Sequence, residues 1–180
     1  MNRPTTDPRH LPPPHASRRS GWWPEAVCAG TLASVLSSAV LGWAGQREQR
    51  SVTVPLNAVS HWWWGRRGLH ARGFSARHTV LGYAIHHGAA LGWAALHAAV
   101  MRGRPGAHRP GAVVAGAAIT SAVACVVDFK CTPERFTPGF EHHLSRPALA
   151  GVYTAFAAGL ALGAWALRAE RPQGARDRKP

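Results

Sequence analysis

The chain has 180 residues, of which 46% are hydrophobic, and it carries a formal net charge of +13. This length is enough for one domain with a core of its own. A strong positive charge can indicate nucleic-acid binding, but no nucleic-acid-binding motif is present, and the arginines lie almost entirely outside the apolar blocks. Basic segments between apolar spans are typical of proteins held in an anionic bilayer. Composition therefore argues against nucleic acid as the partner and indicates the lipid bilayer.

Residues 1–21 are rich in Pro and Arg, which predicts a disordered tail. The apolar stretch that follows, about 25–45, is too long for the hydrophobic part of a usual signal peptide. We expect it to be a first, uncleaved membrane span. Trp22, Trp23 and Trp43 stand near its ends, at the depth that tryptophan prefers in a membrane.

Three consecutive tryptophans occur next, in PLNAVSHWWWG, residues 55–65. This segment is too short to cross a bilayer, so we predict a short interfacial helix over about 52–65. Indole rings are tolerated at headgroup depth, which makes the tryptophans expected membrane anchors. His61 follows Asn57 by four residues, so the two side chains would share a helical face that could turn toward the bundle.

Three more apolar stretches approach or reach the roughly 20 residues needed to cross a bilayer as a helix. They cover about 79–101, 111–129 and 147–167. A soluble four-helix bundle would need a polar face on each helix, but the first, third and fourth stretches carry almost no charge. We therefore predict an all-α fold, a four-helix transmembrane bundle with one interfacial helix between the first two spans. The single membrane domain would cover 22–167, and the charged tail at 168–180 is predicted to be disordered.

Small residues recur in two of these spans at helical spacing. Gly88 and Gly92 lie in the second, and Gly159 and Gly163 lie in the fourth. Such pairs let helix backbones approach closely. They indicate tight packing and are the candidate contacts of a homo-oligomer.

The Lys and Arg counts predict the orientation in the membrane. With four spans, residues 1–21, 102–110 and 168–180 share one side and carry twelve basic residues. The loops 46–78 and 130–146 share the other side and carry nine. The excess predicts a multi-pass inner-membrane protein with both termini in the cytoplasm, so that the two loops face outward.

Unusual polar residues gather in or beside these two outward loops. A histidine within a span is costly and is a functional-site hypothesis by default, although a neutral histidine bonded to another helix would serve packing alone. An aspartate at a span end can equally be a capping charge, and the EHH sequence before the fourth span can be an exposed turn. The candidate polar cluster consists of Asn57, His61, His86, Asp128, Glu141 and His142.

Histidines and carboxylates together are typical of a transition-metal site or of a proton relay. The metal candidates are His61, His86, Glu141 and His142, and haem ligation through His86 is a further possibility. No zinc-binding helix motif is present, so no cofactor is assigned. The three cysteines lack metal or redox spacing, and Cys125 could pair with Cys131 only on an oxidising side of the membrane.

Three stretches carry a resemblance to a family. They are N-A-V-S-H-W-W-W-G at 57–65, G-Y-A-I-H-H at 82–87, and the segment from Val127 to His142 that contains T-P-G-F-E-H. The chain resembles a family of small four-span bacterial membrane proteins that have N-x-x-S-H-W-x-W-G and T-P-G-F-E-H stretches. The resemblance covers most of residues 25–167. It implies a four-span fold and leaves the substrate open.

No nucleophile elbow, phosphate-binding loop or catalytic triad is present, which makes an enzyme the less favoured class. We expect an integral inner-membrane protein whose outward polar cluster binds a ligand or stabilises the bundle. A metal- or haem-dependent redox protein is the second hypothesis. A small-solute or proton-linked transporter is the third, and with only four spans it would need an oligomer.

Overall fold

A computed structural model of the chain describes residues 22–169, and these residues form helices and connecting loops without a strand. The predicted all-α class is therefore confirmed for this part of the chain. The predicted tails, 1–21 and nearly all of 168–180, lie outside the described residues. The four long helices are α1 (Trp22–Gln49), α5 (Leu81–Arg102), α6 (Pro110–Val126) and α7 (Arg146–Ala169). The shorter helices are α2 (Val54–Val59), α3 (His61–Trp64) and α4 (Arg66–Leu69).

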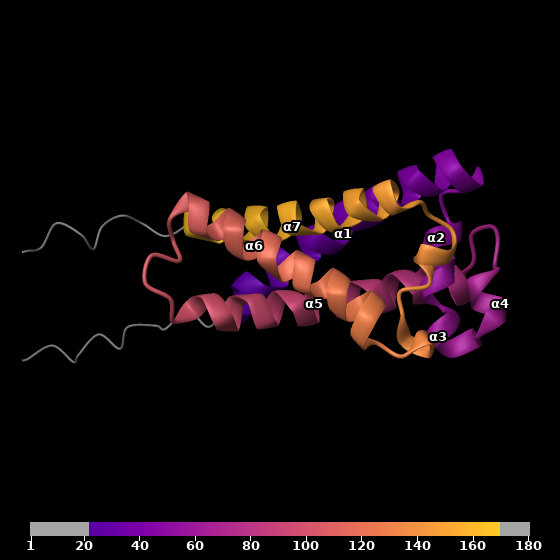
Figure 1. Ribbon diagram of the computed structural model, residues 1–180, viewed down its shortest axis with the longest axis horizontal. Coiled ribbons are helices and arrows are strands. Elements are labelled where there is room, and N and C mark those ends of the chain that lie inside the picture. The colour runs from indigo at the N-terminus through magenta and orange to yellow at the C-terminus, as the bar shows by residue number, and fades with distance from the viewer. Residues whose placement is uncertain (1–21, 170–180) are drawn as a thin grey trace, which may run out of the picture.

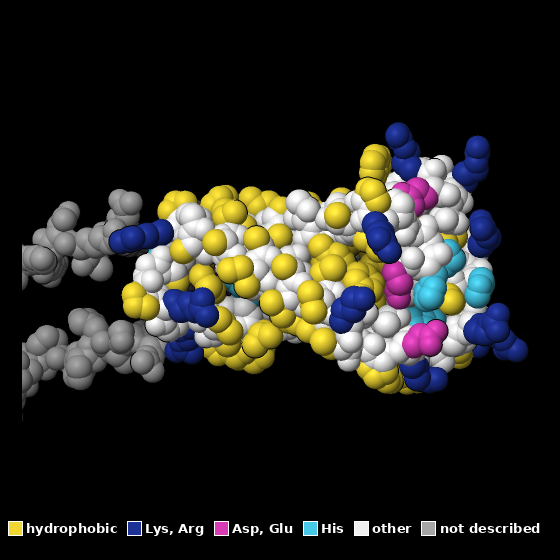
Figure 2. All heavy atoms as spheres, viewed as in Figure 1, with side chains coloured by type: hydrophobic (Ala, Val, Ile, Leu, Met, Phe, Trp, Pro, Cys, Tyr) yellow, Lys and Arg dark blue, Asp and Glu magenta, His cyan; other side chains and the backbone are white. Residues whose placement is uncertain are grey.

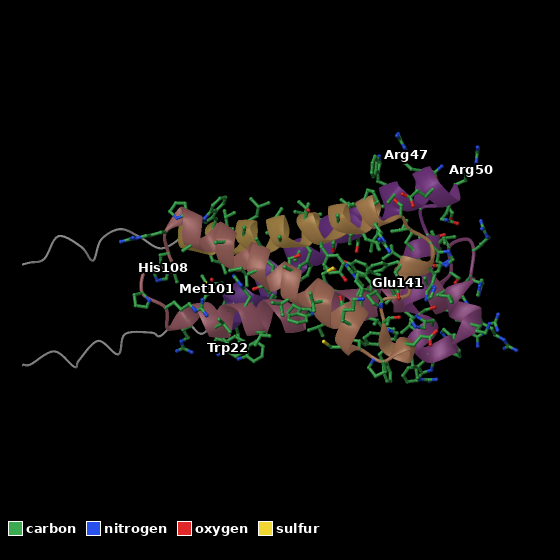
Figure 3. The ribbon with its side chains drawn as sticks, in the orientation of Figure 1. Trp22, Arg47, Arg50, Met101, His108 and Glu141 are labelled. Atoms are coloured by element: carbon green, nitrogen blue, oxygen red, sulfur yellow. The ribbon has the colours of Figure 1, made fainter. Side chains whose placement is uncertain are left out.

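The long helices lie side by side and form an elongated shaft, with α2, α3 and α4 gathered at one end (Figure 1). We call this end the cap, which consists of residues 50–80 and 130–145. Trp22, Met101 and His108 lie at the opposite end, while Arg47 and Arg50 project from the cap end (Figure 3). Charged side chains gather mainly at the two ends, and the shaft between them is largely apolar (Figure 2).

Three helices are long and apolar enough to cross a membrane, namely α1, α6 with its π-helical continuation Val127–Cys131, and α7 from Arg146 to Leu167. Large hydrophobic side chains on their outer faces are exposed, among them Val35, Ile119 and Leu162. Such a surface is unfavourable in water and favourable against lipid. The fold therefore indicates a membrane protein, as the composition predicted.

The helix α1 packs mainly against α7 and α5. Its contact with α7 is close because a Cβ added at Gly159 or Gly163 would lie 2.3 Å from the Cα of Ala33 or Ala29. Both glycines are thus part of a helix contact within one chain. In contrast, a Cβ at Gly88 or Gly92 would meet no atom within 4 Å, so only that pair faces outward, where an oligomer contact could form. The packing at Gly159 and Gly163 explains why alanine and glycine dominate these helices.

The predicted interfacial helix over 52–65 is divided in the structure. The α2 and α3 helices meet at Ser60, whose hydroxyl donates to the carbonyl of Asn57 at 2.7 Å. A side chain that bonds the backbone in this way competes with continued helix formation. The Trp63 side chain, in α3, is 71% exposed.

The close α1–α7 contact predicts different effects for the same substitution at two glycines. Gly159→Ala forces a methyl group into the backbone of α1, and we expect it to lower the free energy of unfolding by about 1–3 kcal/mol. Gly92→Ala is the matched control and should be neutral or slightly stabilising, since alanine favours a helix. Denaturant unfolding in detergent measures both. Equal stabilities for the two variants would contradict the packing.

Candidate functional site

A cavity of about 240 Å³ lies where α5, α6 and α7 meet the cap. On the face drawn in Figure 2, the surface is hollowed among hydrophobic side chains beside the charged cap. Its wall is mostly apolar and includes six aromatic rings, those of Trp62, Trp93, Phe136, Phe140, Tyr153 and Phe156. A cavity with apolar walls and few polar groups is the usual form of a small-molecule site.

Two of the predicted cluster residues, His86 and Asp128, line this cavity. The Nε2 atom of His86 lies 2.9 Å from the Ser37 hydroxyl of α1. The Tyr153 hydroxyl of α7 donates to Asp128 Oδ2 at 2.7 Å. His86 and Asp128 are thus each held by a bond to another helix, which fixes their positions within an apolar environment.

Glu141 lies close to this wall without lining it. Its carboxylate is near enough to Asp128 and Tyr153 to interact with both electrostatically. One of its oxygens, Oε2, is buried without a hydrogen-bond partner, and Oε1 lies 3.9 Å from Nε2 of His142. Figure 3 shows Glu141 among the helices and not at the tip of the cap. His142 is largely exposed.

Asn57 is fully buried and serves the cap itself. Its amide nitrogen donates to the carbonyls of Ala71 and Gly73, at 3.1 and 2.9 Å. Its amide oxygen accepts from the Thr79 hydroxyl at 2.6 Å. Thr79 in turn accepts from the backbone N–H of Ser75. The Asn57 side chain therefore joins α2 to the loop before α5, and its hydrogen-bonding capacity is used in doing so.

His61 also binds backbone, and it lies apart from the cavity wall. Its Nδ1 donates to the carbonyl of Ala58 at 2.8 Å. Gly139 packs against the same place, since an added Cβ would lie 2.7 Å from both Ala58 O and His61 Nδ1. Gly139 also has a φ of +85°, a conformation that glycine adopts without strain. The NAVSH and TPGFEH segments thus pack closely against each other.

Of the three tryptophans, Trp62 turns inward. Its indole N–H donates to the carbonyl of Thr137 at 2.7 Å, and its ring lines the cavity. Trp64 donates to the carbonyl of Arg77 and stacks beneath that guanidinium, 4.3 Å from the ring centroid. Trp63 alone of the three is mostly exposed, so the anchor prediction suits it best.

Within residues 22–169, no three His, Cys, Asp or Glu side chains converge where they could hold a metal ion. The four predicted metal candidates are therefore divided: His86 faces the cavity, His61 bonds the backbone, and Glu141 and His142 neighbour each other. All three cysteines lie within residues 22–169, and all three are free thiols. Cys125 and Cys131 are therefore not paired.

Sequence reasoning did not include two residues that complete the polar wall, Tyr153 and Ser37. Tyr153 is the one tyrosine of an Ala- and Gly-rich helix, and a lone polar aromatic residue at that depth was a usable signal. Ser37 gave no such signal, because serines recur along α1. Comparison with protein-family models, with curated proteins and with solved structures finds no match to this chain.

The Asn57 network predicts a local loss of structure in Asn57→Ala. The substitution leaves the Thr79 hydroxyl without its acceptor and two carbonyls without donors, and each buried unsatisfied group costs about 1–3 kcal/mol. We expect faster tryptic cleavage at Arg72 and Arg77 and lower stability. Ser51→Ala, which removes a cap hydroxyl whose contact is with Thr53, is the control. Cleavage of both variants at the rate of the native protein would refute this role of Asn57.

Proposed function

We propose that this protein is a four-span protein of a bacterial inner membrane, with the cap outside and both termini in the cytoplasm. The fourth span is α5, whose 22 residues reach about 33 Å. It packs along α1 in the same shaft as the three apolar helices. Its histidines make it less apolar, but His86 and His97 are bonded to Ser37 and Thr120 within the bundle. The excess of Arg at the tail end supports the orientation.

The proposed function is to bind a small amphipathic molecule in the cavity beneath the cap. The observation that carries this proposal is the combination of an open apolar cavity with two helix-anchored polar groups, His86 and Asp128. Apolar walls provide affinity, and a few fixed polar groups orient the ligand. Because the cavity lies beside the apolar shaft, a ligand dissolved in the bilayer would reach it directly.

Binding is favoured over transport because the described helices are closed beyond the cavity. Ala94, which lies one turn inward of the cavity on α5, is buried in the larger apolar cluster of the shaft. His97, one turn further, is bonded to Thr120. A polar path toward the tail end is therefore interrupted by packed alanine, leucine and phenylalanine side chains. A redox centre has less support, because the metal candidates do not converge.

The proposed orientation predicts the accessibility of cysteines in spheroplasts. A variant that retains Cys131 and replaces Cys28 and Cys125 with alanine should react with a membrane-impermeant maleimide before lysis, since Cys131 is exposed in the cap. In the cysteine-free background, His108→Cys at the other end should react only after lysis. The reverse pattern would mean that the cap faces the cytoplasm.

The cavity predicts saturable binding of a neutral aromatic amphiphile. The bromine of 4-bromobenzyl alcohol quenches nearby indoles, and Trp62 and Trp93 line the cavity. We expect a saturable component of quenching in nanodiscs, above the linear component from lipid-exposed tryptophans. Ala89→Leu places a larger side chain in the cavity and should remove that component. Ala84→Leu, on the exposed face of α5, should preserve it. Absence of saturable quenching in the native protein would overturn the binding function.

A further inference from the structure

The carboxylates at the cavity lack a Lys or Arg partner among the described residues, although Oε1 of Glu141 lies 3.9 Å from Nε2 of the exposed His142. Within residues 22–169, neither Asp128 nor Glu141 forms an ion pair with a Lys or Arg. This is unexpected in a chain with 21 basic and only 8 acidic residues. A carboxylate at membrane depth is expensive unless a cation or a hydrogen-bond network compensates it. Asp128 receives one hydrogen bond, from Tyr153, and Oε2 of Glu141 receives none.

The aromatic rings of the cavity wall favour an organic cation over a metal ion. Aromatic rings present a negative face that attracts an organic cation, and the effect is stronger where water is excluded. Trp62, Trp93 and Phe156 come from three different elements and face the same space as Asp128. A small hydrated metal ion would gain little there, because its oxygen and nitrogen ligands do not converge. An anion would meet Asp128 without a Lys or Arg on the wall.

We propose that the ligand of this cavity is a lipophilic organic cation, an aromatic or branched amine or quaternary ammonium compound. This inference rests on the proposed binding function and adds the ligand class. The cationic nitrogen lies toward Asp128 and Glu141, and the apolar part lies against the aromatic wall. The arginines of the cap do not oppose this route, because the ligand enters from the bilayer beside the shaft.

Two compounds of equal shape test the proposal. Benzyltrimethylammonium carries the charge, and neopentylbenzene replaces its nitrogen with carbon. Each competes against 4-bromobenzyl alcohol for the saturable quenching of the native protein in nanodiscs. We expect the cation to compete at least about tenfold more strongly, as a desolvated charge pair and cation–π contacts require. Phenylacetate, the anionic analogue, should not compete.

Isosteric variants assign the preference to the carboxylates. Asp128→Asn should abolish the preference for the cation over neopentylbenzene, and its helical circular dichroism and elution as a single species in detergent show that the variant is folded. Glu141→Gln should reduce the preference. Glu134→Gln is the control. It removes an exposed carboxylate of the same loop and should leave the preference for the cation unchanged.

The outcomes separate the two proposals. If neopentylbenzene or phenylacetate competes as well as the cation, the ligand class is wrong and the cavity remains a binding site. If the native protein prefers the cation but Asp128→Asn and Glu141→Gln keep the full preference, the assignment to these carboxylates is overturned. If the bromo alcohol shows no saturable quenching at all, the binding function itself fails, and the choice of ligand fails with it.

Discussion

The hydrogen bonds of one buried amide, that of Asn57, determine the form of the cap. They join α2 to the loop that leads into α5 and leave no polar atom of the amide unused. Because little water reaches this site, solvent does not replace a lost hydrogen bond. The loss of one bond therefore leaves its partner groups unsatisfied and weakens the whole network. Val59 and Trp62, which follow Asn57, form part of the cavity wall. The cavity therefore depends on a hydrogen-bond network that lies outside its wall.

The shaft contributes the second condition for the cavity. Glycine and alanine let α1 and α7 approach until their backbones touch, and the inward half of α5 joins them in a dense apolar cluster. This packing closes the bundle toward the tail end. Nearer the cap, the larger rings of Tyr153 and Phe156 on α7 and Trp93 on α5 border open space. A change from small to large side chains along the same helices thus converts a closed bundle into one with a cavity.

The proposed selectivity of the cavity for a cation is based on the charges around it. Arginine is abundant in the chain, yet the described Lys and Arg side chains lie toward the ends of the molecule (Figure 2). Among the described residues, neither Asp128 nor Glu141 has a Lys or Arg partner, and Glu141 has His142 as its neighbour at 3.9 Å. A carboxylate within an apolar site is unfavourable unless it is compensated, and Asp128 has only the hydrogen bond from Tyr153. The proposed cationic ligand would supply the missing compensation.

The sequence alone determined the helical class, three membrane-length helices close to their observed bounds, and the importance of the two cap segments, because length and hydropathy are local properties. It also identified His86 within a span and Asp128 at the end of a span as unusual polar residues. Only the tertiary structure decided their roles. Hydrogen bonds between residues distant in sequence joined Asn57 to the loop before α5 and Asp128 to Tyr153. Such pairings leave no periodic signal, because they depend on how helices distant in sequence are packed.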